Sequence, residues 1–225
     1  MNLTRLKTAA SCSWRWAKPF LVALIVMGAV RSAVADWNDV PSGSMKPSIL
    51  EGDRIFVNKV AYDLKVPFTS WRLARWAEPM PGDIVVFYEP LHDQRYVKRV
   101  VGLPGDVIEL RDNRLTVNGR AVSYAVPDQA RAASDPLLAS EDLSGRTHPI
   151  LLTPGVASRC TFGPMKVPEG CYFLMGDNRD VSFDSRYFGV VERDRIQGRA
   201  TSVLLSLDPE HGYAPRWDRF FQGLP

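Results

Sequence analysis

Residues 81–110 read PGDIVVFYEPLHDQRYVKRVVGLPGDVIEL. A Pro-Gly-Asp turn starts an apolar run over Asp83 to Tyr88, and a second run follows over Arg95 to Val101. The turn at residues 103–106 then leads into a third run, Asp106 to Leu110. Short runs of this length, each launched by Gly, Pro and Asp, are typical of β-strands. The stretch therefore predicts three consecutive strands joined by turns.

The same pattern continues on both sides of this stretch. Asn118-Gly119 predicts a tight hairpin turn, and only Trp71 to Ala77 has the spacing of a short helix. We predict a mostly β fold, with a folded-over barrel or sandwich core and an inserted smaller subdomain, preceded by one N-terminal transmembrane helix. Further strands are expected over Asp53 to Val60, Leu115 to Val117, Cys171 to Met175 and Ala200 to Leu205.

The N-terminal region combines positive charge with an apolar run. Residues 1–18 carry four cations and no acid, so the formal charge of +3 leaves −1 for the rest of the chain. This distribution indicates a membrane flank, and it argues against a nucleic-acid surface. Phe20 to Val30 is uninterrupted, and the run reaches Ala35, which is short of the roughly 20 residues that a span needs. We predict a cytoplasmic segment 1–18, a transmembrane anchor 19–35 and an exported remainder.

A cleavable signal peptide is the alternative for this region. Ala33-Val34-Ala35 before Asp36 has the small-x-small pattern of a cleavage site, although Arg31 is unusually close for a charged residue.

Two cysteines of the exported part, Cys160 and Cys171, could form a disulfide or stay separate thiols, and the sequence leaves both open. No cysteine and histidine spacing indicates a metal site, so no metal is expected.

A serine turn follows shortly after the apolar run, and it reads Pro41-Ser42-Gly43-Ser44-Met45. A serine hydroxyl becomes a useful nucleophile only when a neighbouring base removes its proton. The chain has no Gly-x-Ser-x-Gly elbow, and its three histidines are scattered singly. A lysine can replace histidine as the base if burial lowers its pKa from about 10.4 toward neutrality.

Lys98 is the candidate base, because it lies inside the apolar run 96–101. Strand alternation puts Lys98 and Arg99 on opposite faces, each between apolar or aromatic neighbours. Arginine keeps its proton in proteins whereas lysine can lose it, so Lys98 is the residue that can be buried neutral. On the alternation alone, a solvated Lys98 is the better interpretation.

Five blocks in order resemble the type I signal peptidases of bacteria, the leader peptidases that use a Ser/Lys dyad. They span most of the exported chain and lie at residues 41–47 (PSGSMKP), 52–53 (GD), 82–87 (GDIVVF), 96–106 (YVKRVVGLPGD) and 176–186 (GDNRDVSFDSR).

The resemblance implies roles for individual residues. Ser44 matches the nucleophile and Lys98 the general base, while the Ser42 hydroxyl joins the Ser44 backbone N–H in the oxyanion hole. Ser182 matches the serine that orients the lysine amine. Asp184 and Arg186 match a supporting ion pair. We expect Asp177 and Asn178 to fix a turn and Met45 to pack beneath the nucleophile.

The implied activity is removal of N-terminal signal peptides from exported preproteins after small residues, in an Ala-x-Ala pattern, with no cofactor. The implied partners are preproteins, the lipid bilayer and, as a further candidate, the translocation machinery, with no nucleic acid. The implied location is the bacterial inner membrane, with a single-pass anchor and the catalytic domain outside. The expected domains are a catalytic β domain (36–119 and 166–206), an inserted subdomain (120–165) and a C-terminal tail (207–225).

Two departures and two alternatives accompany the resemblance. Many Gram-negative members have two membrane segments, whereas this chain has at most one. The sequence before the serine turn also raises the hypothesis that the enzyme cuts its own Ala35–Asp36 bond. Two alternative functions stay open. A specialised maturation protease for pilin-like or conjugation substrates would use the same Ser/Lys chemistry, whereas an inactive exported-peptide-binding protein would hold peptides without cutting them.

Overall fold

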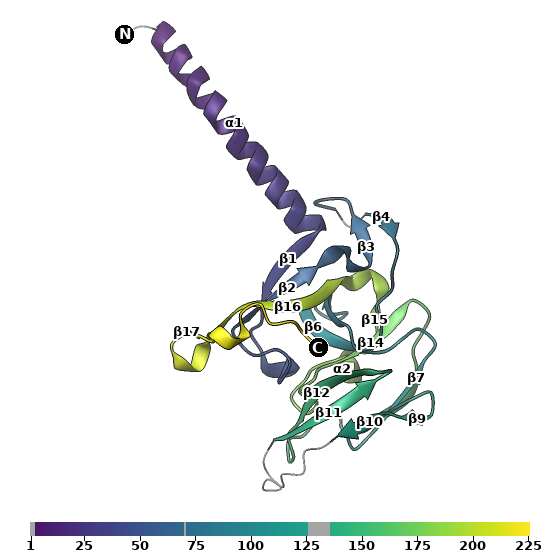
Figure 1. The fold of residues 1–225 in the computed structure, drawn as a ribbon. Coiled ribbons are helices and arrows are strands. Elements are labelled where there is room, and N and C mark those ends of the chain that lie inside the picture. Colours follow the sequence, from purple (N-terminus) through teal and green to yellow (C-terminus); the bar gives the residue numbers. More distant parts are fainter. Residues whose placement is uncertain (1–2, 70, 126–135) are drawn as a thin grey trace.

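The computed structural model describes residues 3–69, 71–125 and 136–225, with side chains from residue 18 on. Its main feature is a curled eight-stranded sheet in the order β1-β2-β16-β5-β6-β14-β15, with β17 also paired to β16 (Figure 1). The curl brings β1 opposite β6, so that both strands line one cavity although three strands separate them in the sheet. The strands are β1 (Ala35–Asp39), β2 (Asp53–Asn58), β5 (Ile84–Tyr88), β6 (Arg95–Gly102), β14 (Cys171–Met175), β15 (Val191–Glu192), β16 (Ile196–Asp208) and β17 (Ala214–Pro215).

Three smaller sheets surround the main one. The first has the order β13-β7-β8-β9, the second β10-β11-β12, and β3 pairs with β4 in the third. Their strands are β3 (Asp63–Lys65), β4 (Arg72–Arg75), β7 (Val107–Arg111), β8 (Arg114–Val117), β9 (Arg120–Ala121), β10 (Ser123–Ala125), β11 (Leu137–Leu143), β12 (Arg146–Leu152) and β13 (Phe162–Lys166).

Helix α1 (Leu3–Ala33) extends away from the β body, and the β3–β4 hairpin lies at its C-terminal end (Figure 1). No helix within the described residues has both the length and the hydropathy that a membrane crossing requires. The expected transmembrane helix is therefore not confirmed. The other helical elements are α2 (Ser185–Phe188) and the 3₁₀ turns η1 (Gly43–Met45), η2 (Lys59–Ala61), η3 (Arg193–Arg195), η4 (Pro209–His211) and η5 (Trp217–Arg219).

The strands predicted from turn chemistry are confirmed, with their ends shifted by a few residues. The Asn118-Gly119 turn joins β8 to β9, and both residues have the positive φ (53° and 75°) that this hairpin type requires. The helix suggested for Trp71 to Ala77 is wrong. Its first part is strand β4, which satisfies its backbone groups by pairing with β3.

Residues 120–165 contain far more strand structure than their sequence indicates. Strands β11 and β12 pair along their whole length, and a turn with positive φ at Ser144 and Gly145 joins them. Residues 126–135 of this expected subdomain lie outside the described part. Strand β13, from the same segment, pairs with β7 of the preceding one, so the sheets do not separate at residue 119.

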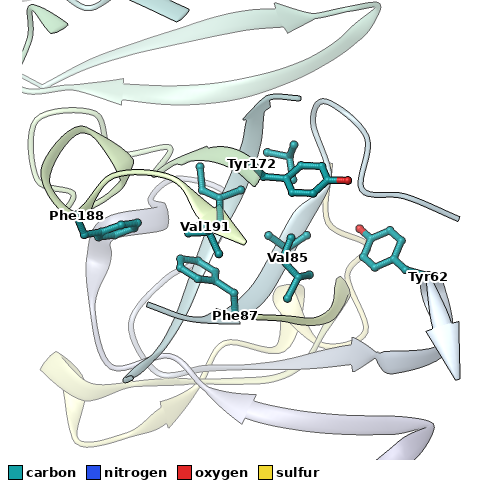
Figure 2. Close-up of a cluster of buried hydrophobic side chains, with 9 residues drawn as sticks. Tyr62, Val85, Phe87, Tyr172, Phe188 and Val191 are labelled. Carbon is teal, nitrogen blue, oxygen red and sulfur yellow. The ribbon is translucent and has the colours of Figure 1, made fainter. Parts of the chain in front are cut away.

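The main sheet encloses apolar clusters of buried side chains. Figure 2 shows one buried cluster, in which Val85 and Phe87 of β5 pack against Tyr172 of β14 and Phe188 of α2. Cys160 and Cys171 are free thiols, so the disulfide considered from the sequence is not formed.

The Ala35–Asp36 bond lies inside strand β1, where Ala35 is paired with Asn58. The Asp36 carboxylate is buried and forms ion pairs with Arg31 at 2.9 Å and Lys59 at 3.2 Å. Self-cleavage at this bond would therefore require β1 to leave the sheet first.

Candidate active site

The serine turn is held in place by the residue that follows the serine. Met45 is buried and packs with Ile49 and Ile55, as expected, which fixes η1 from beneath. The Lys46 N–H donates to the Gly43 carbonyl and closes the turn at 3.0 Å. Ser44 itself is only half-buried, so its hydroxyl faces the cavity between β1 and β6.

Lys98 reaches Ser44 from strand β6, and its Nζ lies 2.6 Å from Ser44 Oγ. The side chain is only 3 % exposed, and none of the described carboxylates lies within 4.0 Å of the amine. Burial lowers the pKa of the Lys98 ammonium to about 8, against a weaker opposing pull from Asp184 and Asp177. The amine therefore changes protonation state near neutral pH, in hydrogen-bond contact with a serine.

A second lysine shows why this contact matters more than the lowered pKa. Burial also lowers the pKa of Lys65 to about 8. Among the described residues, however, its amine hydrogen-bonds only to the Ile196 carbonyl and the Gln197 side chain, at 3.5 Å and 3.4 Å. Neither group is a nucleophile that a base could activate. Geometry therefore selects Lys98.

Arg99, the neighbour of Lys98 on the opposite face of β6, is also fully buried at 1 % exposure. Its guanidinium binds both carboxylate oxygens of Asp177, at 2.8 Å and 2.7 Å. Burial would raise the pKa of Asp177, but the charge and hydrogen bonds of Arg99, together with smaller contributions from His148 and Ser48, keep that pKa low. The strand thus buries one lysine and one arginine, and only the arginine has a counter-charge within ion-pair distance.

The loop after β14 closes over the serine turn. The Asn178 N–H donates to the Ser44 carbonyl at 3.1 Å, and its Nδ2 donates to the Gly43 carbonyl at 3.1 Å. The sequence suggested a turn for Asp177 and Asn178 but gave no signal for this contact with the nucleophile. A side chain at Gly176 would overlap both the Ser44 carbonyl oxygen and Ser182 Oγ. The loop and the serine turn therefore touch through backbone atoms.

The remaining expected residues are close to this arrangement, with one difference. Asp184 and Arg186 form a fully buried two-pronged ion pair, with both bonds at 2.8 Å. Ser182 Oγ is buried but finds no hydrogen-bond partner among the described residues, so the expected bond to Lys98 is not formed. Ser42 Oγ lies 3.4 Å from Ser44 Oγ at the cavity surface.

The cavity in front of Ser44 has a volume of about 550 Å³. Its walls are the end of β1 with the serine turn on one side and, on the other, Gln94 with residues 95–98 of β6, and Phe183 adds an aromatic ring. Strand β14 pairs with β6 only at Arg99 and beyond, so one edge of residues 95–98 is free of β14. The cavity is thus an open groove beside an available strand edge.

The family profile described as "Signal peptidase, peptidase S26" matches residues 13–205. The chain belongs to this family. It is 36 % identical to Signal peptidase I of Pseudomonas fluorescens and 35 % identical to that of Pseudomonas aeruginosa, in each case over 91 % of this chain and 77 % of the relative. Signal peptidase I of Bacillus licheniformis is 31 % identical over 85 % of this chain and 88 % of its own length.

A crystal structure of a signal peptidase I from Enterococcus faecalis is 32 % identical. It aligns with 55 % of this chain and 97 % of its own, and the TM-score of 0.36 is too low to support an argument about the fold. The sequence relationships themselves establish that the protein is a hydrolase of the signal peptidase type, and the relationship supports signal peptide removal by a serine protease.

Replacing Gly176 by alanine tests the close approach of loop and serine turn. The added methyl group has no space, so Gly176→Ala should displace Ser44 and lower kcat by about 100-fold, the size expected for a misplacement of about 1 Å. Gly223→Ala is the matched control, since a side chain there meets open space. Steady-state cleavage of a preprotein measures both, and equal activity of the two variants would contradict the steric argument.

Replacing Asp184 by asparagine tests the buried ion pair. Arg186 would keep its charge without a partner, so Asp184→Asn should lower the free energy of unfolding by about 3–5 kcal/mol in urea titrations. Asp93 pairs with Arg195 at the surface, and Asp93→Asn should cost less than about 1 kcal/mol. Similar losses in both variants would show that burial does not decide the effect.

Proposed function

We propose that the chain removes N-terminal signal peptides from exported preproteins after small residues, with Ser44 as nucleophile and Lys98 as general base. The observation that carries the proposal is the 2.6 Å contact between a buried, uncompensated lysine amine and a half-exposed serine hydroxyl. Family membership supports the reaction class, and this contact supports the choice of the two proposed residues.

The reaction follows from the geometry. The neutral Lys98 amine accepts the Ser44 proton while the hydroxyl oxygen attacks the carbonyl carbon of the scissile bond. The resulting ammonium then donates that proton to the leaving amine, which frees the mature protein and leaves an acyl-enzyme at Ser44. Lys98 next takes a proton from water, and the hydroxide attacks the acyl carbon and displaces Ser44 Oγ. The Lys98 ammonium returns its proton to that oxygen, which releases the signal peptide and restores the neutral amine and the serine hydroxyl. No cofactor takes part in these steps.

Donors near Ser44 would stabilise the oxyanion of the tetrahedral intermediate. The Ser42 hydroxyl, at the cavity surface beside Ser44, is the proposed side-chain donor, together with the Ser44 backbone N–H. For Ser182 we propose the orienting of the Lys98 amine. Its support is a buried hydroxyl without another partner among the described residues, since such a group is costly to leave unpaired.

The groove suits an extended peptide. A substrate strand that pairs with the free edge of residues 95–98 would place its backbone between β6 and β1, with Ser44 at the end of the groove. Exported preproteins present such an extended segment next to their signal sequence. Strand addition thus explains how peptides of differing sequence are held by one site.

The lysine base predicts a rise of activity with pH. The pKa of Lys98 in the folded protein is about 8, so the fraction of neutral amine should increase as pH rises through 8, and kcat/KM should increase with it. Ser44→Ala and Lys98→Met should be inactive on an Ala-x-Ala preprotein between about pH 6 and 10. Lys98→Arg is the matched control, because it keeps the charge but cannot release a proton.

Substantial cleavage by Lys98→Arg would rule out the general-base role of the lysine. A wild-type protein that binds the preprotein without cutting it would instead point to a peptide-binding protein. Cleavage confined to pilin-like substrates would identify the narrower maturation protease.

We also propose that the chain is membrane-bound by the N-terminal segment, single-pass, with the cationic end in the cytoplasm and the catalytic groove on the outer face. Helix α1 exposes apolar side chains over residues 20–30. The hairpin patch, defined as Phe68, Trp71, Leu73 and Trp76, is exposed beside it, and the Phe68 N–H donates to Ser32 Oγ of α1 at 2.7 Å. Exposed tryptophans beside an apolar helix suit the headgroup layer of a bilayer.

Membrane attachment can be measured by fractionation of bacterial cells that express the full chain. We expect the protein in the membrane pellet, and we expect it to stay there during alkaline carbonate washing if the N-terminal segment is inserted. Release of the protein by the wash would indicate surface binding through the hairpin patch in place of insertion. Recovery of the protein in the supernatant before any wash would contradict membrane attachment. The double variant Trp71→Ser with Trp76→Ser would show how much the hairpin patch contributes to retention in the membrane pellet.

A further inference from the structure

The sheet β10–β12 lies at the end of the molecule away from α1, yet it contacts the active-site loop (Figure 1). Strand β12 is the edge strand of this sheet, and its free edge faces residues 177–179. The Leu151 N–H donates to the Asp177 carbonyl at 2.9 Å, and the Arg179 N–H donates back to the Leu151 carbonyl at 2.9 Å. The loop is thus added to the sheet as a very short parallel strand.

A buried side-chain cluster reinforces this backbone pairing. Glu141 of β11 and Arg179 of the loop are 0 % and 1 % exposed, and the Arg179 guanidinium binds both carboxylate oxygens. The Tyr124 hydroxyl donates to Glu141 Oε1 at 2.6 Å, and His148 Nε2 lies 3.3 Å from Oε2. One residue from each of the three strands therefore belongs to this cluster, and Glu141 at its centre binds Arg179 of the loop.

The same arginine connects the cluster to the nucleophile. Arg179 Nε donates to the Gly176 carbonyl at 3.2 Å, and Gly176 is the residue that has no space for a side chain against Ser44. Asn178, between them, donates to the Ser44 and Gly43 carbonyls. A continuous path of buried hydrogen bonds therefore leads from Glu141 through the loop to the serine turn.

We propose that the sheet β10–β12 is a clamp that sets the distance between Ser44 and Lys98, and that Glu141 is its positioning residue. The inference rests on the proposed function, because it concerns how the proposed nucleophile is held. Glu141 does not reach the reacting atoms itself. It acts by keeping Arg179, and with it residues 176–178, against the serine turn.

The charge state of the cluster fits a permanent clamp. Burial by itself would raise the pKa of the Glu141 carboxyl, but the Arg179 guanidinium beside it keeps that pKa well below its usual range. The carboxylate therefore stays ionised across the working pH range. The ion pair between Glu141 and Arg179 is therefore kept over that range.

Glu141→Gln tests the clamp, because it keeps the shape of the side chain and removes its charge. We expect kcat to fall by about tenfold or more while KM stays unchanged, since the groove between β1 and β6 is not touched. We also expect faster amide hydrogen exchange at Asn178, whose N–H is bonded to Ser44. Both are measured well below the melting temperature, where each variant is fully folded.

Asp63→Asn is the matched control. Asp63 is a buried carboxylate that binds the buried Arg193 at 3.0 Å, in strand β3 near α1 (Figure 1). This variant should also lose stability, but its kcat and the exchange at Asn178 should match wild type. If Asp63→Asn and Glu141→Gln lower kcat equally, the loss reflects general destabilisation and the clamp is wrong.

The double variant Glu141→Gln with Arg179→Met separates positioning from stability. Removing both charges should restore the melting temperature, because no unpaired arginine stays buried. A kcat that remains low supports the clamp, and a kcat that recovers with stability overturns it. If Glu141→Gln does not fold, Tyr124→Phe removes one bond to Glu141 and should give a smaller loss of kcat with unchanged KM.

These outcomes are distinct from a failure of the proposed function. Wild-type protein that does not cleave an Ala-x-Ala preprotein removes the Ser44 and Lys98 proposal. Wild-type cleavage together with full kcat in Glu141→Gln removes only the clamp.

Discussion

The proposed chemistry depends on one constraint, which is the burial of the Lys98 amine against Ser44 without a carboxylate in contact. An ammonium in such a place loses its hydration and gains no ion pair, so the neutral form is favoured. A nearby carboxylate would have restored the charge and removed the base. The loops around Lys98 contain carboxylates, so each of these has to be paired with a cation other than the lysine.

Paired arginines meet this requirement. Each of three carboxylates around the active-site loop is bound by its own arginine, and all six side chains are fully buried. Such pairs add little net stability compared with apolar packing, but breaking one is costly. Their value here is that they fix the loop while presenting almost no net charge to Lys98. The pairs are Arg99 with Asp177, Arg179 with Glu141, and Arg186 with Asp184.

The sequence predicted the parts that depend on local chemistry. The strands of the main sheet follow from turn residues, and Lys98 was chosen over Arg99 by the chemistry of the two side chains. The sheet β10–β12 was missed because Glu141 and His148 occupy inward positions, where the alternation signal expects apolar residues. The Nδ2 bond from Asn178 to the serine turn joins residues 135 positions apart, which only the tertiary fold brings together. No local pattern contains that information.

Strand β6 shows how binding and chemistry are joined. Its first residues, 95–97, are partly open, whereas every residue from Lys98 to Gly102 is buried. The same strand therefore has a free edge and then, one residue later, the proposed base. A substrate that paired with this edge as proposed would carry its scissile carbonyl toward Ser44 and would cover the open side of the groove. Its binding would remove more water from the Lys98 amine and would further favour the neutral form. Strand addition and activation of the base are thus two consequences of one contact.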